Sequence, residues 1–327
     1  MSALQSTTNP TATQFTHGVC YYPEHWPQSQ WKIDASLMKK AGLKTIRIAE
    51  FSWALLEPEE GVYDFTSLDS AISTFSSFDF QIIIGTPTAC PPAWSTLKYP
   101  QSLRRDEAGI KMKPQSRRHA DCNNNDYNRL CMNITKELAK RYGKHLNVYG
   151  WQIDNEYGCH NTVRSTSIDS DIKFREWLKI RYDNDLNLLN EKWGSVFWSQ
   201  SYNEWGEILC PTSEIPAAHS PSLVIDFKRF SSDSWLKFNL DQRTILRKFC
   251  KPESQITHNM MLYYFDYDMP KLAEQLDFVS WDNYETYGAH PIAVAANHDW
   301  MFGAGDKPFW VMEQQLGQVN WGVYGQQ

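Results

Sequence analysis

The feature that most constrains the fold of this chain is an alternation of short β-branched or aromatic runs with longer segments of helical periodicity. Seven runs are predicted strands: 18–22, 45–50, 82–87, 148–153, 256–261, 278–282 and 309–312. Helical patterns lie between them, among them 30–41, 126–142, 172–182, 231–250 and 270–275. Strands that alternate with helices indicate βα units and a parallel sheet.

The sequence therefore predicts an α/β fold, a (β/α)8 TIM barrel truncated after the seventh strand, because only 314–327 follow that strand. A doubly wound open sheet is the alternative, since it needs no eighth strand. We expect a barrel domain over 16–327, with a long, Trp-rich insertion at 157–255. Residues 1–15 are rich in Ser and Thr and lack the basic and apolar regions of a signal peptide, so a disordered leader is predicted there.

Charge and hydropathy exclude several classes of partner. Lys and Arg number 32 against 38 Asp and Glu, a formal net charge of −6, so we expect no nucleic-acid partner. Mean hydropathy is −0.54 and no window has the length and apolar character of a membrane span, so we expect no membrane partner. The seven cysteines are dispersed and include no CxxC pair, which favours a cytoplasmic location.

Two glutamates stand at the ends of predicted strands. Glu156 follows Asn155 after the fourth strand, and Glu313 ends the seventh. Active sites of parallel barrels lie at the C-terminal ends of the strands, where bulky apolar neighbours partly desolvate a carboxyl group. Two carboxylates across a barrel mouth suit glycoside hydrolysis, in which one protonates the leaving oxygen and the other attacks the anomeric carbon. The alternative is that each glutamate is a rim residue in an ion pair.

Five motifs, in order along the chain, carry a resemblance to a known family. They are GVCYYPEHWP at 18–27, IRIAEFSWALLEP at 46–58, SRRH at 116–119, QIDNEYG at 152–158 and FWSQ at 197–200. The chain resembles the family 42 glycoside hydrolases, which are β-galactosidases of clan A of the retaining glycosidases, from about residue 17 to its end.

The resemblance implies a role for several residues. Glu156 matches the general acid/base and Glu313 the nucleophile of a retaining β-galactosidase, which would place their carboxyl groups roughly 5 to 5.5 Å apart. Asn155 matches the partner of the sugar 2-hydroxyl group. The further substrate-binding residues that the resemblance implies are Arg47 and Tyr284 beside the nucleophile, Arg117 near the sugar, and Trp198 and Trp321 as walls of the sugar site.

Two departures from the family pattern bear on these expectations. Some members bind zinc through a cysteine cluster, but this chain offers only His119, Cys122, Cys159 and His160 near the matching positions, so we expect no metal and no cofactor. Family members also continue beyond the seventh strand. The expected partner is a galactoside or oligosaccharide, with a homo-oligomer possible in a full-length protein. A clan-related β-glycosidase for another sugar, or a truncated galactoside-binding remnant without catalysis, stays open.

Overall fold

The computed structural model describes residues 16–261, 266–284 and 290–314. Its strands are β1 (Gly18–Cys20), β2 (Thr45–Ile48), β3 (Gln81–Gly85), β4 (Val148–Gln152), β5 (Gln255–Thr257), β6 (Asn259–Met261), β7 (Val279–Asn283) and β8 (Phe309–Gln314). Each of the seven predicted runs contains a strand, but the run 256–261 is two strands, β5 and β6, that meet at His258. The predicted leader at 1–15 and everything beyond 314 lie outside the described residues.

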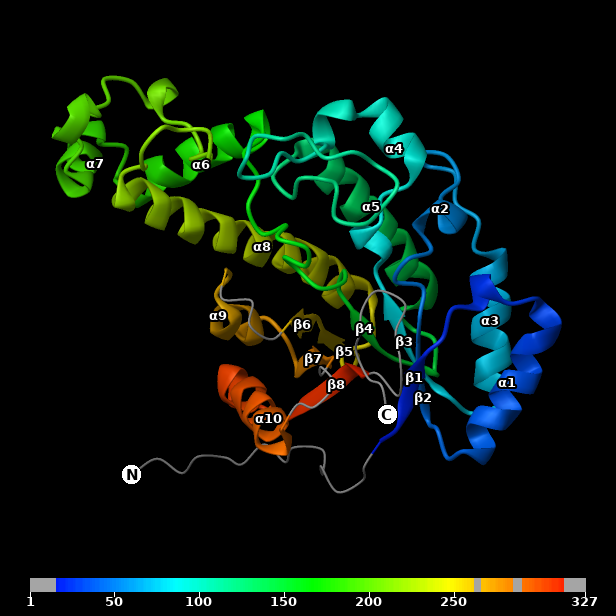
Figure 1. Cartoon of the computed structure of the whole chain (residues 1–327). Coiled ribbons are helices and arrows are strands. Elements are labelled where there is room, and N and C mark those ends of the chain that lie inside the picture. The colour runs from blue at the N-terminus through cyan, green and yellow to red at the C-terminus, as the bar shows by residue number, and fades with distance from the viewer. Residues whose placement is uncertain (1–15, 262–265, 285–289, 315–327) are drawn as a thin grey trace.

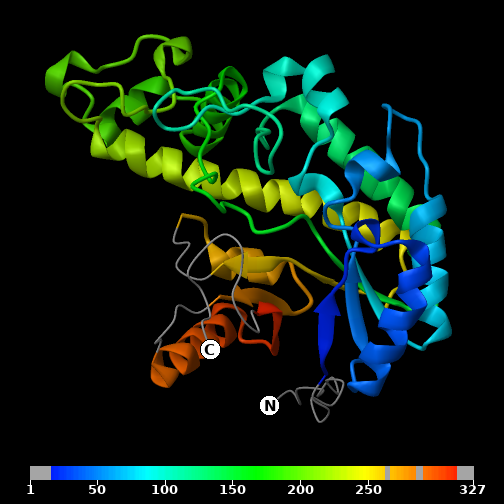
Figure 2. The ribbon, with the colours of Figure 1, turned by 45° about the vertical axis from the view of Figure 1, so that its right-hand side comes forward.

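The strands form one parallel series in the order of the sequence. β1 to β5 are hydrogen-bonded side by side, and β6 to β8 continue the series after His258. β1 and β8 are not ladder partners, but the Cys20 thiol lies 3.8 Å from the Met312 carbonyl oxygen, so the two outer strands approach each other (Figure 2). A doubly wound sheet reverses its order near the middle, so this order confirms the barrel architecture.

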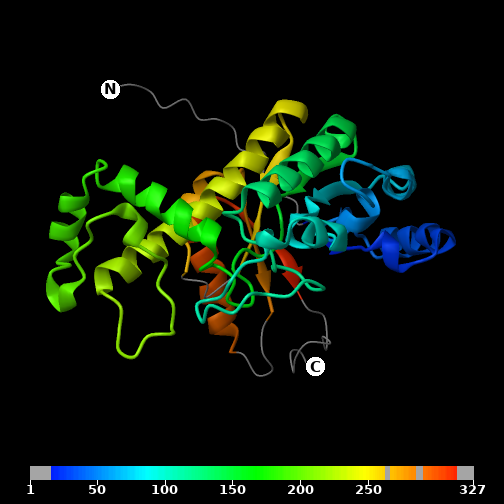
Figure 3. The same ribbon diagram turned by 90° about the horizontal axis from the view of Figure 1, so that it is seen from above.

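Helices cover the outer side of the strands (Figure 1). The α-helices of the described residues are α1 (Gln28–Lys40), α2 (Trp53–Leu56), α3 (Thr66–Ser77), α4 (Ala93–Lys98), α5 (Asn125–Tyr142), α6 (Ile168–Arg181), α7 (Leu186–Trp193), α8 (Pro221–Phe249), α9 (Met269–Glu274) and α10 (Pro291–Gly305). α5 and α8 pack side by side (Figure 3), and α10 packs on β7. Within the described residues, no helix combines the length and the apolar character needed to cross a membrane.

The main core lies between the strands and these helices. The β-branched side chains of Ile46, Ile82 and Ile84 are fully buried against apolar helix faces such as those of Ala35 and Phe75. β-branched residues suit strands that are covered on both sides, as the strands of a parallel barrel are. Helix ends follow local signals. The side chain of Asn124, for example, accepts a hydrogen bond from the Tyr127 N–H group and caps the start of α5.

A second, smaller core lies in the segment between β4 and β5. Phe174 of α6, Trp193 of α7 and Phe227 of α8 belong to it, whereas Trp235 and Leu246 of α8 belong to the main core. α8 is 29 residues long, so it runs about 43 Å and joins the two cores. α6 and α7 consequently lie away from the strands, at the far end of α8 (Figure 1).

His258, where the fifth predicted strand breaks, holds the loop that follows β4. Its ring is completely buried and stacks on Tyr157 with 3.7 Å between centroids. Nε2 accepts a hydrogen bond from the Tyr157 N–H group (3.2 Å), so Nδ1 carries the proton and donates it to the Ile153 carbonyl oxygen (2.8 Å). Burial, opposed by that second hydrogen bond, lowers the pKa of His258 to about 3. The neutral ring therefore clamps both ends of residues 154–156.

The low pKa of His258 predicts a loss of stability in acid. Histidine in the unfolded chain takes up a proton near pH 6.5, but the folded protein binds that proton only near pH 3. Between these values, His258 should lower the free energy of unfolding by about 1.4 kcal/mol for each unit that the pH falls. His258→Gln, which does not titrate, should show a weaker pH dependence in urea unfolding between pH 4 and 7. Parallel curves for both proteins would contradict this account.

Candidate active site

Polar side chains from five of the strand positions meet at the C-terminal ends of the strands. They are Arg47 on β2, Asn155 and Glu156 directly after β4, Asn259 on β6, Asp282 and Tyr284 at the end of β7, and Glu313 on β8. The sequence positions of these residues are far apart, and only the parallel series of strands brings them to one place. Because active sites of barrels form at this end, this cluster is the candidate active site.

A one-residue shift in the strand register aims Glu313 into this cluster. The ring of Phe309 packs on His298 of α10, so an unbroken alternation would turn residues 309, 311 and 313 toward the helices. The pairing of β7 with β8 skips Met312, and the ladder partner of Asp282 is Glu313. Such irregularities redirect side chains beside active sites, and here the shift turns Glu313 to the inner side of the strands.

Arg47 is the cation that receives Glu313. Its side chain is almost fully buried, with 2.6 Å from one terminal nitrogen to Glu313 Oε1 and 2.7 Å from the other to Gln152 Oε1. Arg47 also pairs with the buried carboxylate of Glu50 at 2.8 Å. Residue 85 must be glycine to leave space for Glu50. A Cβ atom at Gly85 would lie only 2.4 Å from the Glu50 Cβ atom.

The surroundings of Glu313 favour its ionised form. Burial by itself raises the pKa of this carboxyl group, but the charge of Arg47 and the hydrogen bonds from Tyr284 and Arg47 outweigh burial and hold the pKa below its ordinary value. The Tyr284 hydroxyl donates to Glu313 Oε2 over 2.6 Å. Burial and the neighbouring Glu313 charge raise the pKa of Tyr284 above its usual range, so Tyr284 remains a donor at neutral pH. Arg47 and Tyr284 thus both contact Glu313, and their roles in binding substrate stay predictions.

Glu156 lies across from Glu313 on a strained turn. The backbone of Asp154 and Glu156 has positive φ angles of 55° and 48°, which non-glycine residues seldom adopt and which gather at functional sites. Glu156 Oε2 accepts hydrogen bonds from Arg117 (2.6 Å) and from the Asn155 amide (3.2 Å). Glu156 is nearly fully buried, so the turn presents one carboxyl group to the interior of the site.

Three carboxyl groups face one another in this cluster. One oxygen each from Glu156, Asp282 and Glu313 lies within 4.8 Å of the other two. Glu156 and Glu313 are therefore close enough to act on the two sides of one scissile bond, as the acid and the nucleophile of a retaining glycosidase do. Glu156 binds Arg117, whereas Glu313 binds Arg47, so each glutamate has its own cation.

Glu156, Asp282 and Glu313 are the candidate cation ligands in the described part of the chain. Arg117 already pairs with Glu156 and Arg47 with Glu313, so two of the three carboxylates have a guanidinium partner. The cysteines and histidines considered for zinc do not gather among the described residues. Cys159 and His160 contact Arg117 at 3.5 and 3.3 Å, and the His119 ring bonds to the Ser116 carbonyl oxygen.

Of the two predicted tryptophans, the one among the described residues, Trp198, is not part of this cluster. Trp198 lies in a short 3-10 turn (Phe197–Ser199) after α7, is 62% exposed and stacks on Phe197. The turn belongs to the segment at the far end of α8, away from the strands (Figure 1). Trp321 lies outside the described residues. The roles of both side chains in binding sugar stay predictions.

Sequence reasoning missed four polar residues that complete the site. Gln152, His258 and Asn259 are fully buried, and Asp282 nearly so. Each lies within one of the predicted strand runs. A buried polar residue needs hydrogen-bond partners, so a polar side chain inside a predicted central strand was the signal that could have identified them.

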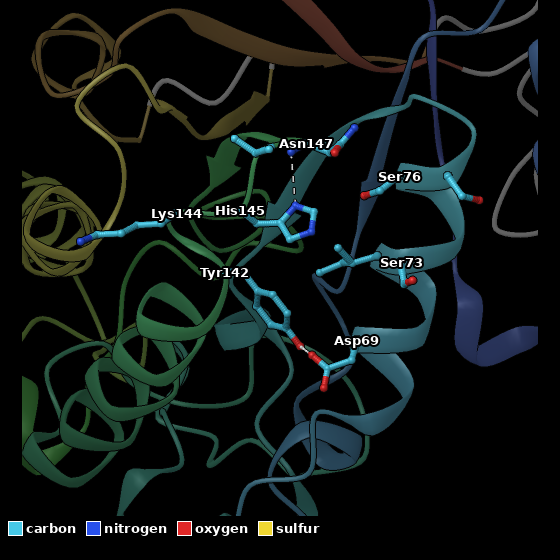
Figure 4. Close-up of a pocket in the computed structure, with 10 residues that line it drawn as sticks. Asp69, Ser73, Ser76, Tyr142, Lys144, His145 and Asn147 are labelled. Carbon is cyan, nitrogen blue, oxygen red and sulfur yellow. Dashed lines mark hydrogen bonds between the residues drawn. The ribbon is translucent and has the colours of Figure 1, made fainter.

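One hollow in the described structure lies away from this site. It measures about 670 Å³ and lies between α3 and the loop from α5 to β4, with Asp69, Ser73 and His145 among its lining residues (Figure 4). In it, the Tyr142 hydroxyl donates to Asp69 over 2.8 Å. Asn147 and Ser77 precede β4 and β3, so this hollow opens at the N-terminal ends of the strands. Residues at that end of a barrel support its stability.

Comparisons with known proteins identify relatives of this chain. The model of glycoside hydrolase family 42, described as beta-galactosidase, matches residues 20–327. A curated relative, beta-galactosidase BgaA from a Thermus species, is 43% identical over 321 residues, which are 93% of this chain and 49% of that protein. The chain thus spans about half the length of the curated relatives it matches.

Solved structures agree with the family model. The beta-galactosidase from the psychrophilic Marinomonas ef1 is 38% identical, with a TM-score of 0.91 over 95% of this chain and 50% of that one. A catalytic mutant of a GH42 beta-galactosidase from G. stearothermophilus, in which a glutamate is replaced by alanine, is 31% identical, with a TM-score of 0.87 over 95% of this chain and 47% of that one. This chain therefore belongs to the beta-galactosidases of glycoside hydrolase family 42.

Proposed function

We propose that this chain carries the catalytic centre of a retaining β-galactosidase, with Glu313 as the nucleophile and Glu156 as the general acid/base. The observation that supports this most directly is the pair of carboxyl groups within 4.8 Å, in two different electrostatic surroundings. Glu313 is held ionised by Arg47 and Tyr284, as a nucleophile must be. A catalytic glutamate in the solved relative from G. stearothermophilus is consistent with this assignment.

The reaction follows from these positions as a double displacement. A Glu313 oxygen attacks the anomeric carbon while Glu156 gives its proton to the glycosidic oxygen, and the aglycone leaves. Glu156 Oε2 accepts from Arg117 and Asn155, which leaves Oε1 to carry the proton. Glu156, now ionised, takes a proton from water, and that water releases the galactose from Glu313. Asn155 lies beside Glu156, and we assign to it the binding of the sugar 2-hydroxyl group, a contact that strengthens in the transition state.

Further assignments belong to the same proposal. We assign residues 16–327 to a barrel catalytic domain with an insertion at 157–255, and Arg117, Trp198 and Trp321 to sugar binding. The proposed substrate is a terminal, non-reducing β-D-galactoside.

The net charge of −6 and the dispersed cysteines support a cytoplasmic protein that does not bind nucleic acid. A homo-oligomer is compatible with the second core, which extends α6 and α7 away from the strands.

Replacement of either glutamate should abolish turnover. Glu313→Gln and Glu156→Gln should each lower kcat for an aryl β-galactoside by roughly 1,000-fold or more, because each removes a step that the other residue cannot supply. Azide should partly restore turnover of an activated substrate in the Glu156 variant alone, since azide replaces the water that Glu156 activates but not the nucleophile.

A matched control for these variants is Glu57→Gln. Glu57 is buried, as Glu156 is, and its carboxylate accepts hydrogen bonds from the Trp53 indole (2.7 Å) and the Gly61 N–H group (2.8 Å), neither of which involves a catalytic glutamate. This variant should keep its kcat. An unchanged kcat in Glu313→Gln or Glu156→Gln would refute the assignment of the nucleophile and the acid/base. Hydrolysis of aryl glucosides or mannosides by the wild type faster than that of aryl galactosides would refute the galactose specificity.

Tyr284 should control the acidic limb of the pH profile. Tyr284→Phe removes a hydrogen bond to ionised Glu313, so the pKa of Glu313 should rise and the acidic limb of kcat/KM should move to higher pH. The loss of a hydrogen bond to a charged group should also lower kcat/KM by roughly 10- to 100-fold at its optimum. Tyr142→Phe, in the hollow at the opposite end, is the control and should leave the profile in place. A limb that stays fixed in Tyr284→Phe would contradict the role of Tyr284.

A further inference from the structure

A buried asparagine connects the two glutamates. Asn259 on β6 is completely buried, and its side chain reaches the loop after β4, the neighbouring strand β7, and β8 on the other side of β7 (Figure 1). Its Oδ1 atom accepts a hydrogen bond from the Glu156 N–H group (3.1 Å). Its Nδ2 atom lies 2.6 Å from Asp282 Oδ2, 3.0 Å from Asn155 Oδ1 and 3.4 Å from Glu313 Oε1.

These partners fix the orientation of the Asn259 amide. Nδ2 has two hydrogens and no lone pair to offer, and it faces three oxygen acceptors. A flipped amide would set Oδ1 against those oxygens and Nδ2 against the Glu156 N–H group. The native orientation therefore holds the backbone of Glu156 on one side and contacts the Glu313 carboxylate on the other.

Asn259 also sets the amide of its neighbour Asn155. Asn155 Oδ1 accepts from Asn259 and from Gln152 Nε2 (3.2 Å), so its Nδ2 group must point to Glu156 Oε2. The Glu156 carboxylate, its backbone and the Glu313 carboxylate are thus all within one or two hydrogen bonds of a single amide group. Removal of that amide would disturb their relative positions.

Asp282 is the nearest partner of Asn259 and differs from the two glutamates. It is 3% exposed, and its Oδ1 atom has no hydrogen-bond partner in the described part of the chain. The titratable and charged groups that face it are Glu313 on β8, Glu156 after β4, Arg47 on β2, Cys20 on β1 and Tyr284 after β7. The guanidinium groups there pair with Glu50, Glu313 and Glu156.

A negative charge on Asp282 would therefore be poorly compensated. Its only hydrogen-bond donor in the described structure is the neutral Asn259 amide. Burial, and then the charges of Glu313 and Glu156, raise the pKa of Asp282 well above its usual range. A buried carboxyl group without a cation takes up a proton rather than remain charged.

We propose that Asn259 is the positioning residue that holds Glu156 and Glu313 in their working arrangement, and that Asp282, as a neutral carboxyl group, orients Asn259. This inference rests on the proposed function in naming the two glutamates as the reacting pair. Neither Asn259 nor Asp282 carries out a proton transfer or a bond-making step in this account.

Two pairs of variants test the proposal in steady-state kinetics. Asn259→Ala and Asn259→Asp both remove the Nδ2 donors, and each should lower kcat roughly 100-fold with little change in KM, because the reacting groups shift while the substrate still binds. Asp282→Asn has the shape and neutrality of a protonated aspartate, so it should lose much less of kcat than Asp282→Ala, which should resemble Asn259→Ala. Asn124→Ala, which deletes a buried cap of α5, is the control and should lower the melting temperature but not kcat.

The outcomes separate this inference from a general loss of structure. Equal losses of kcat in Asp282→Asn and Asp282→Ala would show that a negative charge is needed and would overturn the assignment of Asp282. Wild-type kcat in either Asn259 variant would overturn the role of Asn259. If the Ala variants fail to fold, the isosteric Asn259→Asp and Asp282→Asn variants still decide the question.

A second measurement does not depend on activity. Carbon-13 labelling of the aspartate carboxyl groups, with Asp282→Asn to identify the signal of Asp282, reports its protonation directly. The signal should keep the position of a neutral carboxyl group from pH 4 to 7, and the position of an ionised one at pH 6 would overturn the proposal for Asp282. A wild-type protein that hydrolyses no galactoside would refute the proposed function, while the NMR result would still stand for Asp282.

Discussion

A buried guanidinium group joins the two ends of the described chain at its functional centre. Arg47 on β2 binds Glu313 on β8, which follows it by 266 residues, and also binds Gln152 and Glu50. Burial of such charges is expensive, and removal of one partner from a buried ion pair typically costs about 3 to 5 kcal/mol because a lone charge remains. The arrangement therefore contributes less through net stability than through what it does to Glu313, which it keeps ionised and fixed in position. β2, β4 and β8 must all be in place before this can happen.

The three carboxyl groups of the site differ chemically because the strands give each of them different neighbours. Glu313 has a cation and a phenolic hydroxyl, and Glu156 lies on a left-handed turn beside Arg117, whereas the partner of Asp282 among the described residues is a neutral amide. Strained backbone of the kind found at Asp154 and Glu156 costs of order 1 to 3 kcal/mol for each residue and persists only where the surroundings enforce it. His258 enforces it here, since its two ring nitrogens bind the residues on both sides of the turn. Glu156 can then face Glu313 across the site.

Much of the fold and part of the site could be predicted from the sequence. The other features depend on contacts between strands that a sequence pattern does not contain. Periodicity placed the seven strand runs and the two glutamates at their ends, because strands buried on both sides have a simple apolar pattern. Periodicity did not show the break at His258 or the register shift at Met312, since each depends on hydrogen bonds to a neighbouring strand. Arg47 and Tyr284 came from the resemblance to a family. Asn259 and Asp282 were not predicted because their roles in the site depend on side-chain contacts between strands.

The central claim is that Glu313 forms a covalent bond to galactose. The most direct measurement is intact-mass analysis after incubation of the protein with a 2-deoxy-2-fluoro-galactoside that has an activated leaving group, followed by peptide mapping. Fluorine at position 2 slows both steps by destabilising the oxocarbenium-like transition state, and the good leaving group lets only the first proceed. The account predicts one adduct, on the peptide that contains Glu313. An adduct on another residue, or hydrolysis of β-galactosides without any adduct, would contradict it.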